Sequence, residues 1–163
     1  GRISEEKGID ELVKAFLGSN LNNLTLKIIG NGPSLKGLKK KYVGKSVEFI
    51  NEVSNTDVLD IISKSKGVVT ATKLYEGQPT LLCEASTLGV PSLFPESGGI
   101  AEFFPKDYVL SYKQFDYVDL QNKLKMLNNL EVLTNQGKKN KEFISNFLDE
   151  QILVEKYKKV INE

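Results

Sequence analysis

Short runs of apolar and β-branched residues alternate with longer segments of helical periodicity along most of this sequence. The runs typical of strands are residues 24–29, 47–50, 67–70, 90–94 and 108–110. The helical segments are residues 9–18, 33–42, 55–62, 80–88, 118–127, 130–143 and 148–161. Because strand–helix–strand units favour parallel pairing through right-handed crossovers, this alternation predicts an α/β fold. We expect a Rossmann-like, doubly wound parallel sheet with helices on both faces.

Residues that cap or break helices set the expected ends of several elements. Gly18 and Gly89 stand where the periodic segments stop, which is typical of helix C-termini. Pro33 suits the first turn of a helix, because its missing N–H has no partner there anyway. Asn55 or Thr56 is the expected N-cap of the helix that follows the second strand.

The composition excludes several kinds of chemistry. The 163 residues include no His and a single cysteine, Cys83. Without His, catalysis by a Ser-His-Asp or Cys-His arrangement is excluded, and one cysteine excludes an internal disulfide and a Cys-rich zinc site. The 22 basic and 21 acidic residues nearly balance, which argues against a protein that coats nucleic acid. Catalysis must therefore use carboxylates, amines, hydroxyls, backbone groups or a cofactor.

The length suits one domain with its own core, and we interpret residues 1–163 as a single domain. No apolar run approaches the roughly 20 residues that span a bilayer. Since the sequence starts with Gly1 and not with Met, we expect it to be part of a longer protein. The five lysines between residues 36 and 45 are interpreted as a solvated helix face.

Doubly wound sheets bind ligands at the carboxyl ends of their strands, so the loops there are the candidate site. These loops are residues 1–7, 30–33, 50–55, 71–79 and 96–99. In the first loop, Gly1 allows close approach of a ligand to the backbone, and Arg2 and Lys7 beside a helix start suit a phosphate or diphosphate. Arg2 is also the only Arg, against 21 Lys. The alternative is a pair of surface cations at a chain end.

Two carboxylates in and after the loop at residues 71–79 are the second candidate. Glu76 lies in the loop, and Glu84 lies on the helix that follows, within an apolar stretch. A carboxylate is costly to bury without hydrogen-bond donors, and sugar hydroxyls are such donors. The free N–H groups at the helix start, near residues 78–81, attract phosphate. The alternative is that Glu76 is a helix-start charge and Glu84 an exposed helix residue.

The run Gly30-Asn31-Gly32-Pro33 is not a dinucleotide fingerprint of the G-x-G-x-x-G type, because Leu35 stands where the third glycine belongs. Taken alone, it is equally consistent with a tight turn that binds nothing.

Five stretches in this order resemble the donor-binding half of retaining glycosyltransferases of family 4, also called group 1, which have the GT-B architecture. The stretches are residues 1–8, 26–33, 47–51, 76–85 with the acids in an E-x₇-E pattern, and 89–102 with Gly98, Gly99 and Glu102. The resemblance covers nearly the whole chain. It implies a nucleotide-sugar (donor) binding domain with the same doubly wound fold.

The resemblance also implies a role for individual residues. Arg2 and Lys7 would bind the diphosphate and stabilise the leaving nucleoside diphosphate, and Glu76 would contact the donor sugar; these are the implied catalytic residues. The implied donor-binding residues are Gly1, Gly30, Gly32, Phe49, Ile50, Gly77, Gln78, Pro79, Thr80, Leu81 and Glu84. Among them, Glu84 would hold the ribose hydroxyls, and Gly30, Gly32, Phe49 and Ile50 would line the base pocket. No metal and no further cofactor is expected.

In this family an acceptor-binding N-terminal domain precedes a sequence of this kind, so we expect that domain to be absent from the chain. The strand that normally ends at the Gly-Arg pair would lie before Gly1, at the centre of the sheet. Its absence would leave a gap, unless the molecule has residues that precede Gly1. The last helix, residues 148–161, would pack on the missing domain. We therefore expect the isolated domain to have little transferase activity.

The expected partner is a nucleotide-sugar, and no nucleic acid. The expected location is the cytoplasm, at or near the inner face of the cell membrane, with membrane contact only through the missing half. The expected reaction is sugar transfer with retention to a glycan, a lipid-linked sugar or a cell-surface polysaccharide. Alternatives are a non-catalytic nucleotide- or carbohydrate-binding module on the same scaffold, a nucleotide-sugar epimerase, and a plain α/β interaction domain. The residues leave the sugar, the base and the acceptor open.

Overall fold

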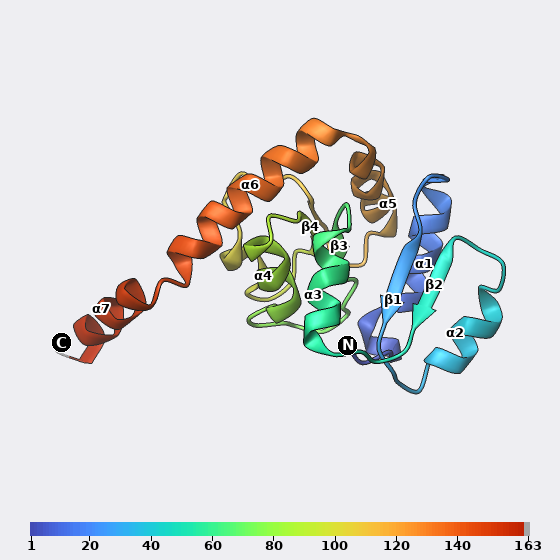
Figure 1. The fold of residues 1–163 in the computed structure, drawn as a ribbon, viewed down its shortest axis with the longest axis horizontal. Coiled ribbons are helices and arrows are strands. Elements are labelled where there is room, and N and C mark those ends of the chain that lie inside the picture. Colours follow the sequence, from blue (N-terminus) through green and yellow to red (C-terminus); the bar gives the residue numbers. More distant parts are fainter. Residues whose placement is uncertain (162–163) are drawn as a thin grey trace.

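The structure is a computed structural model that describes residues 1–161, drawn as a ribbon in Figure 1. The strands are β1 (Leu26–Ile29), β2 (Val47–Ile50), β3 (Val68–Val69), β4 (Ser92–Pro95) and β5 (Ser111–Tyr112). The helices are α1 (Ile9–Gly18), α2 (Leu35–Lys41), α3 (Asn55–Ser63), α4 (Thr80–Thr87), α5 (Tyr117–Lys125), α6 (Leu130–Phe147) and α7 (Glu150–Ile161). Short 3-10 helices are Glu5–Lys7, Ile100–Phe103 and Met126–Asn128.

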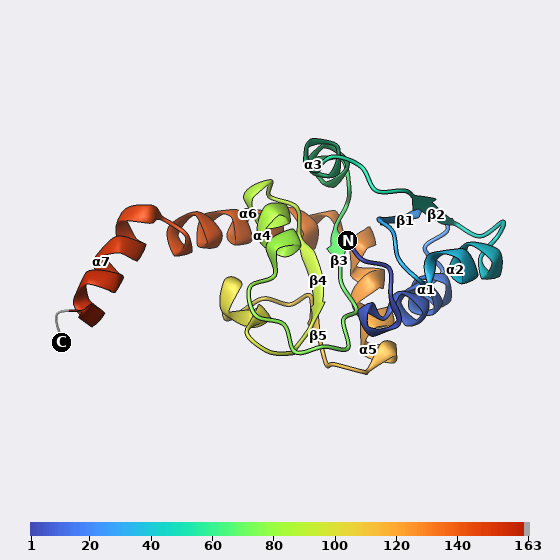
Figure 2. The ribbon, with the colours of Figure 1, turned by 90° about the horizontal axis from the view of Figure 1, so that it is seen from below.

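All strand pairs are parallel, and they form two groups. β1 pairs with β2, and β3, β4 and β5 pair in that order. Figure 2 shows helices on both sides of the strands, with α3, α4 and α6 on one side and α1 and α5 on the other. The predicted α/β fold, with a doubly wound parallel sheet and helices on both faces, is confirmed.

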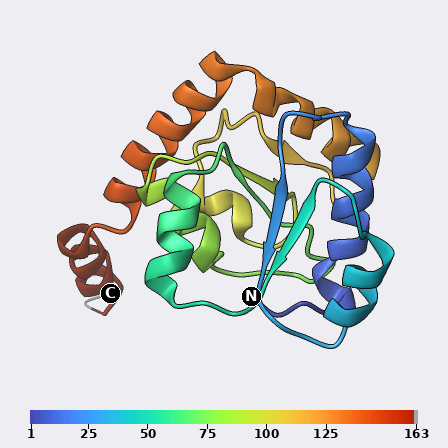
Figure 3. The same cartoon turned by 45° about the vertical axis from the view of Figure 1, so that its right-hand side comes forward.

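Among the described residues no strand joins β1 to β3, and a gap separates the two. A cavity of about 1050 Å³ extends through this gap. Its walls include Leu26 and Ile28 of β1 on one side and Val69 of β3 on the other. Figures 1 and 3 show the amino terminus beside the carboxyl end of β1, at one mouth of the gap.

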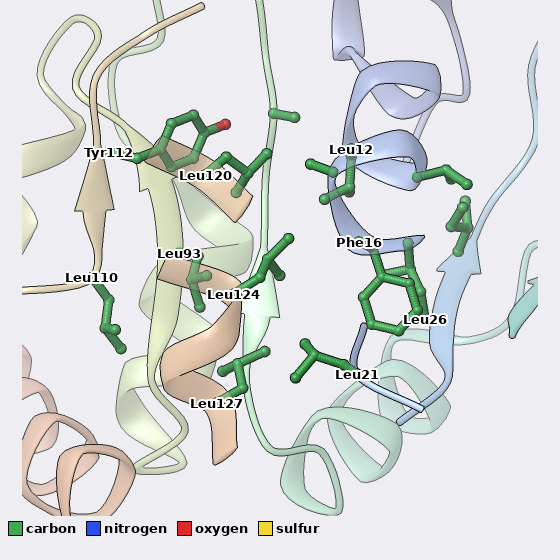
Figure 4. Close-up of a cluster of buried hydrophobic side chains, with 14 of the residues drawn as sticks. Leu12, Phe16, Leu21, Leu26, Leu93, Leu110, Tyr112, Leu120, Leu124 and Leu127 are labelled. Atoms are coloured by element: carbon green, nitrogen blue, oxygen red, sulfur yellow. The ribbon is translucent and has the colours of Figure 1, made fainter. Parts of the chain in front are cut away.

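One hydrophobic core joins the two groups of strands beneath the gap. Its buried residues come from β1, α1, β4, β5, α5 and segments next to them. Figure 4 shows two facing sets: Leu12, Phe16, Leu21 and Leu26; and Leu93, Leu110, Tyr112, Leu120, Leu124 and Leu127. The apolar spacing of α1 places Leu12, Val13 and Phe16 on one side of the helix, and all three are buried. α1 also contacts α5, so it packs against the second half of the chain.

The fifth strand lies later than expected. The structure forms β5 at Ser111–Tyr112, and the predicted strand at residues 108–110 is wrong. The reason is that the preceding residues bond elsewhere. The Tyr108 hydroxyl donates to the Ser92 carbonyl at 2.5 Å and accepts from the Ser92 N–H at 2.8 Å, and the Val109 N–H donates to Gln136 Oε1 at 3.3 Å. Pairing with β4 begins only with Ser111.

Several helix ends also differ from the predictions. The N-cap of α3 is Ser54, whose hydroxyl accepts the Asp57 N–H at 3.2 Å, so the predicted caps Asn55 and Thr56 are wrong. α6 extends to Phe147, and α7 begins at Glu150. Figure 1 shows α7 pointing away from the body of the molecule, and its apolar side chains are exposed. No helix within residues 1–161 has both the length and the hydropathy to cross a membrane.

Candidate functional site

The first loop of the candidate site runs beside the end of β1. The amine of Gly1 donates to the Ile29 carbonyl at 2.8 Å, and the Ile3 N–H donates to the Asn31 carbonyl at 2.7 Å. Gly30 and Gly32 have φ of 136° and 158°, and a Cβ there would lie 1.8 Å from the Gly1 oxygen and 2.2 Å from the Ile3 oxygen. Residues 1–3 can therefore lie this close to residues 30–32 only because positions 30 and 32 are glycines. The role of these glycines in a base pocket remains a prediction.

The loop at residues 71–79 is held against the first loop by main-chain contacts. The Lys73 N–H donates to the Glu6 carbonyl at 2.8 Å. Gly8 has φ of 64°, and a Cβ there would lie 2.0 Å from the Ala71 oxygen. Only glycine meets both conditions without strain, because this left-handed conformation and this close approach both exclude a side chain. The two loops are therefore fixed to one another, and Lys7 lies between their contact points.

The contact between Lys7 and Glu76 is the centre of the site. Lys7 Nζ lies 2.7 Å from Glu76 Oε1, and the two side chains are 36% and 31% exposed. The buried Thr72 donates its hydroxyl to the same Oε1 at 2.9 Å. The hydrogen bond from Lys7 lowers the pKa of Glu76, although burial opposes it, and Thr72 adds to the effect. Among the described residues, Oε2 of Glu76 has no hydrogen-bond partner, so it is available to a ligand donor.

The loop after β4 fixes the main chain of Glu76 from behind. The Gly99 N–H donates to the Glu76 carbonyl at 2.9 Å, and the Ser97 hydroxyl donates to the Leu74 carbonyl at 3.1 Å. Gly98 has φ of 61°, and a Cβ there would lie 2.1 Å from the Glu76 oxygen. Three loops, at residues 1–8, 71–79 and 96–99, therefore determine where the Glu76 carboxylate lies.

The start of α4 faces the same cavity. The N–H groups of Leu82 and Cys83 both donate to the Pro79 carbonyl, whereas those of Thr80 and Leu81 precede the first intrahelical bonds. The cavity that fills the gap also reaches this helix start and the two loops. Of the predicted site residues, it is lined by Gly1, Arg2, Lys7, Glu76, Gln78, Pro79, Thr80 and Leu81.

The remaining predicted residues lie outside the walls of this cavity. Glu84 is half-buried on α4, and in the described part of the chain its carboxylate makes no hydrogen bond or ion pair. Phe49 and Ile50 end β2 and are half-buried. Gly77 is exposed with open space around its Cα. The donor-binding roles of these residues, like those of Gly30 and Gly32, stay predictions.

Sequence reasoning missed Thr72 and the role of Ser4. The Ser4 hydroxyl donates to Glu6 Oε1 at 2.6 Å and, as the largest cause, lowers the pKa of Glu6, with Arg2 and Lys7 nearby. Neither residue belongs to a period or motif that distinguishes it from an ordinary loop hydroxyl. Gly98 and Gly99 did carry a signal, because they lie in the loop that follows a strand.

The strand order and the cluster of a lysine, a carboxylate and a helix start at the strand ends define a ligand-binding domain of the doubly wound α/β class. The family described as glycosyl transferases group 1 matches residues 1–147. The chain belongs to this family.

Individual proteins and solved structures are similar to this chain. The chain is 31% identical over 155 residues to Protein CapJ of Staphylococcus aureus, an alignment that covers 86% of this chain and 38% of CapJ. It is 29% identical over 119 residues to the amylovoran biosynthesis glycosyltransferase AmsD of Erwinia amylovora, with 69% of this chain and 33% of AmsD covered. The structure of Anabaena HepE in complex with UDP-glucose superposes with a TM-score of 0.84 and 16% identity, over 99% of this chain and 47% of HepE. The chain thus spans less than half of the length of each.

Proposed function

We propose that this chain is the donor-binding domain of a glycosyltransferase that transfers a sugar from a nucleotide-sugar to an acceptor, with retention at the anomeric carbon. The observation that carries the proposal is the contact of Lys7 with Glu76 at 2.7 Å, beside the start of α4. This contact brings together, in one cavity, an ammonium that can bind phosphate and a carboxylate that can bind sugar hydroxyls. Family membership and the UDP-glucose named for HepE support the same ligand class.

In this proposal the cations stabilise the leaving group. Arg2 and Lys7 carry the positive charge that meets the diphosphate as the bond to the sugar breaks, and the Thr80 and Leu81 N–H groups add dipoles. These groups neutralise the diphosphate, so the proposed reaction needs no metal. Oε2 of Glu76 accepts a hydrogen bond from a hydroxyl group of the donor sugar.

The nucleoside part would lie beyond the diphosphate. Glu84 holds the ribose hydroxyls, and Gly30, Gly32, Phe49 and Ile50 contact the base. Gly77, Gln78 and Pro79 shape the sugar contact. The proposed acceptor is a growing glycan, a lipid-linked sugar or a surface polysaccharide, which the similarity to AmsD, an amylovoran biosynthesis glycosyltransferase, supports.

The acceptor would be bound by an N-terminal domain of the longer protein, with α7 packing against that domain. The proposed location is the cytoplasm, at the inner face of the cell membrane. On this proposal the 163-residue chain binds nucleotide weakly and shows little or no turnover. Robust transfer by the chain alone would contradict the need for the acceptor domain.

Titration calorimetry with UDP, GDP and ADP and with their glucose esters tests the binding part. For the nucleotide that binds, Lys7→Met should weaken affinity about 10-fold or more, because a charge-assisted hydrogen bond is worth about 1.5–3 kcal/mol. Glu76→Gln should weaken the sugar ester more than the free diphosphate. The matched control is Lys14→Met, since Lys14 pairs with Asp10 on α1, outside the cavity. Unchanged affinity in Lys7→Met, or equal loss in the control, would exclude the proposed site.

A further inference from the structure

A side-chain contact of Lys73 also holds the loop at residues 71–79. Lys73 Nζ lies 2.8 Å from Glu11 Oε1, and the two side chains are 28% and 26% exposed. Glu11 lies in the first turn of α1, 62 positions away in the sequence. The contact therefore joins the loop to a helix that is distant in the sequence.

This ion pair is well protected from solvent. Of the ion pairs formed within residues 1–161, it is the least exposed. Donation to Glu11 raises the pKa of Lys73, although burial opposes this. Burial opposes ionisation of Glu11, but the hydrogen bond from Lys73 lowers its pKa. Since charges partly removed from water are screened less than exposed ones, the pair can hold its two segments together.

The main chain of Lys73 contacts the segment that carries Lys7. The Lys73 N–H donates to the Glu6 carbonyl at 2.8 Å. Glu6 belongs to the 3-10 helix Glu5–Lys7, which ends at Lys7. Position 73 is therefore joined both to α1 and to the short helix that carries the Lys7 ammonium.

The residue before Lys73 contacts the other partner of the central ion pair. Thr72 donates its hydroxyl to Glu76 Oε1 at 2.9 Å and accepts the Leu74 N–H at 3.2 Å. In the described part of the chain, the hydrogen bonds to the Glu76 carboxylate come from Lys7 and Thr72 and not from Lys73. Lys73 can therefore influence this carboxylate mainly through the position of the loop.

We propose that Lys73 is a positioning residue: its ion pair with Glu11 holds the loop so that Glu76 stays in contact with both Lys7 and Thr72. Neither Lys73 nor Glu11 lines the cavity, so neither would touch a ligand there. A displacement of about 1 Å in a group that binds a ligand can cost about 100-fold in function, so a support outside the cavity can still control the site. For the ligand, the inference rests on the proposed function; for the geometry of Glu76, it does not.

The decisive test is the pKa of the Glu76 carboxyl in Glu11→Gln, measured by nuclear magnetic resonance titration. Loss of the negative charge of Glu11 would by itself lower the pKa of Glu76. If the ion pair positions the loop, the same variant raises this pKa, because Oε1 is no longer aligned with its two donors. Lys73→Met should also raise it, whereas Lys73→Arg keeps the charge and should stay close to the unaltered chain.

The matched control is Lys139→Met. Lys139 of α6 also pairs with a carboxylate of a distant segment, Asp107, and neither residue lines the cavity. This variant should leave the pKa of Glu76 unchanged. Titration calorimetry with UDP-glucose is the second readout: Lys73→Met should weaken its binding about 5-fold or more, and the control should not.

Several results would overturn the proposal. These are an unchanged or lowered pKa of Glu76 in Glu11→Gln, an equal rise in the control, or weaker binding of UDP-glucose with an unchanged pKa of Glu76. Failure of both Glu11→Gln and Lys73→Met to fold would mean that the pair stabilises the whole domain and not the loop. If the unaltered chain does not bind UDP-glucose, the proposed function fails for that donor, and the titration of Glu76 still decides the role of Lys73.

Discussion

Gly98 provides the sharpest test of how the site is held together, because the chain offers a matched control. Gly98 and Gly44 have nearly the same left-handed backbone, with φ of 61° and 72°. A Cβ at Gly98 would lie 2.1 Å from the Glu76 oxygen, whereas a Cβ at Gly44 would have nothing within 4 Å. Substituting each by Ala therefore separates the effect of the close approach from that of the backbone conformation.

The expected magnitudes follow from these distances. Either substitution places Ala in the left-handed region at a cost of about 1–2 kcal/mol, partly offset by the lower entropy of the unfolded chain. For Gly44→Ala we expect a net loss of about 1 kcal/mol or less. At Gly98 the new methyl group must also move from 2.1 Å to at least the 3.4 Å of ordinary contact, a shift of about 1.3 Å. That shift breaks the Gly99 hydrogen bond to Glu76, so we expect a loss of about 2–4 kcal/mol.

Urea unfolding at 25 °C, followed by circular dichroism, measures both free energies of unfolding, and the thermal midpoints should differ by about 4–8 °C. Nuclear magnetic resonance titration of the Glu76 carboxyl gives a local readout. Its lowered pKa should return toward the ordinary value in Gly98→Ala, because the loop that positions the carboxylate beside Lys7 has moved, but not in Gly44→Ala. If the two variants unfold with free energies within about 0.5 kcal/mol of one another, the close approach does not position Glu76 and the reasoning is wrong.

Three further predictions concern polar contacts. Tyr108→Phe removes the partner of both the N–H and the carbonyl of the buried Ser92. Urea titrations should therefore show a free energy of unfolding lower by about 1–3 kcal/mol. Thr72→Val should raise the pKa of Glu76 in a carboxyl titration, because Oε1 loses one of its two donors. Burial opposes ionisation of Asp10, but hydrogen bonds from two lysines and a tyrosine lower its pKa. The wild-type protein should therefore lose stability as the pH falls below about 4, and Asp10→Asn should reduce this loss. Urea midpoints taken from pH 2 to 6 measure the difference.

Each of these has an internal control. Tyr157 is 68% exposed on α7, so Tyr157→Phe should leave stability unchanged, and an equal loss there would contradict the explanation for Tyr108. Thr87→Val should leave the Glu76 titration unaffected, because its hydroxyl bonds only within α4. For Asp10, the stability at alkaline pH is a second readout. Burial and the contact with Asp10 raise the pKa of Tyr42 to about 12, so the stability that Tyr42 contributes is present below pH 10 and is lost as the pH rises toward 12.

The elements that the sequence predicted well are those whose periodicity agrees with their burial. α1 is an example: its apolar spacing, its Gly18 end and its packing face all agree with the structure. β5 could not be predicted in this way. The run at residues 108–110 has strand composition, but the Tyr108 hydroxyl and the Val109 amide bond to distant residues, and only tertiary contacts decide this.

The site shows the same division. The E-x₇-E spacing and the cations near the helix start marked Lys7 and Glu76, and the structure brings them into contact although 69 positions separate them. Thr72 and the contacts of Gly8 and Gly98 were out of reach, because they depend on which loops meet at the strand ends. A glycine in a sequence can indicate a left-handed backbone conformation. The carbonyl group with which a side chain at that position would clash belongs to another loop, and the sequence does not show which one.

The ammonium of Lys7 is held by a counter-ion that belongs to the protein. An anion that takes this ammonium must compete with Glu76, and it leaves a partly buried carboxylate with Thr72 as its remaining donor. A bare phosphate offers nothing in return, whereas a ligand with hydroxyl groups beside its phosphates replaces the lost donor. In the site as proposed, Glu76 therefore competes with any anion for Lys7, and a ligand that brings hydroxyl donors together with its phosphates overcomes this competition better than phosphate alone.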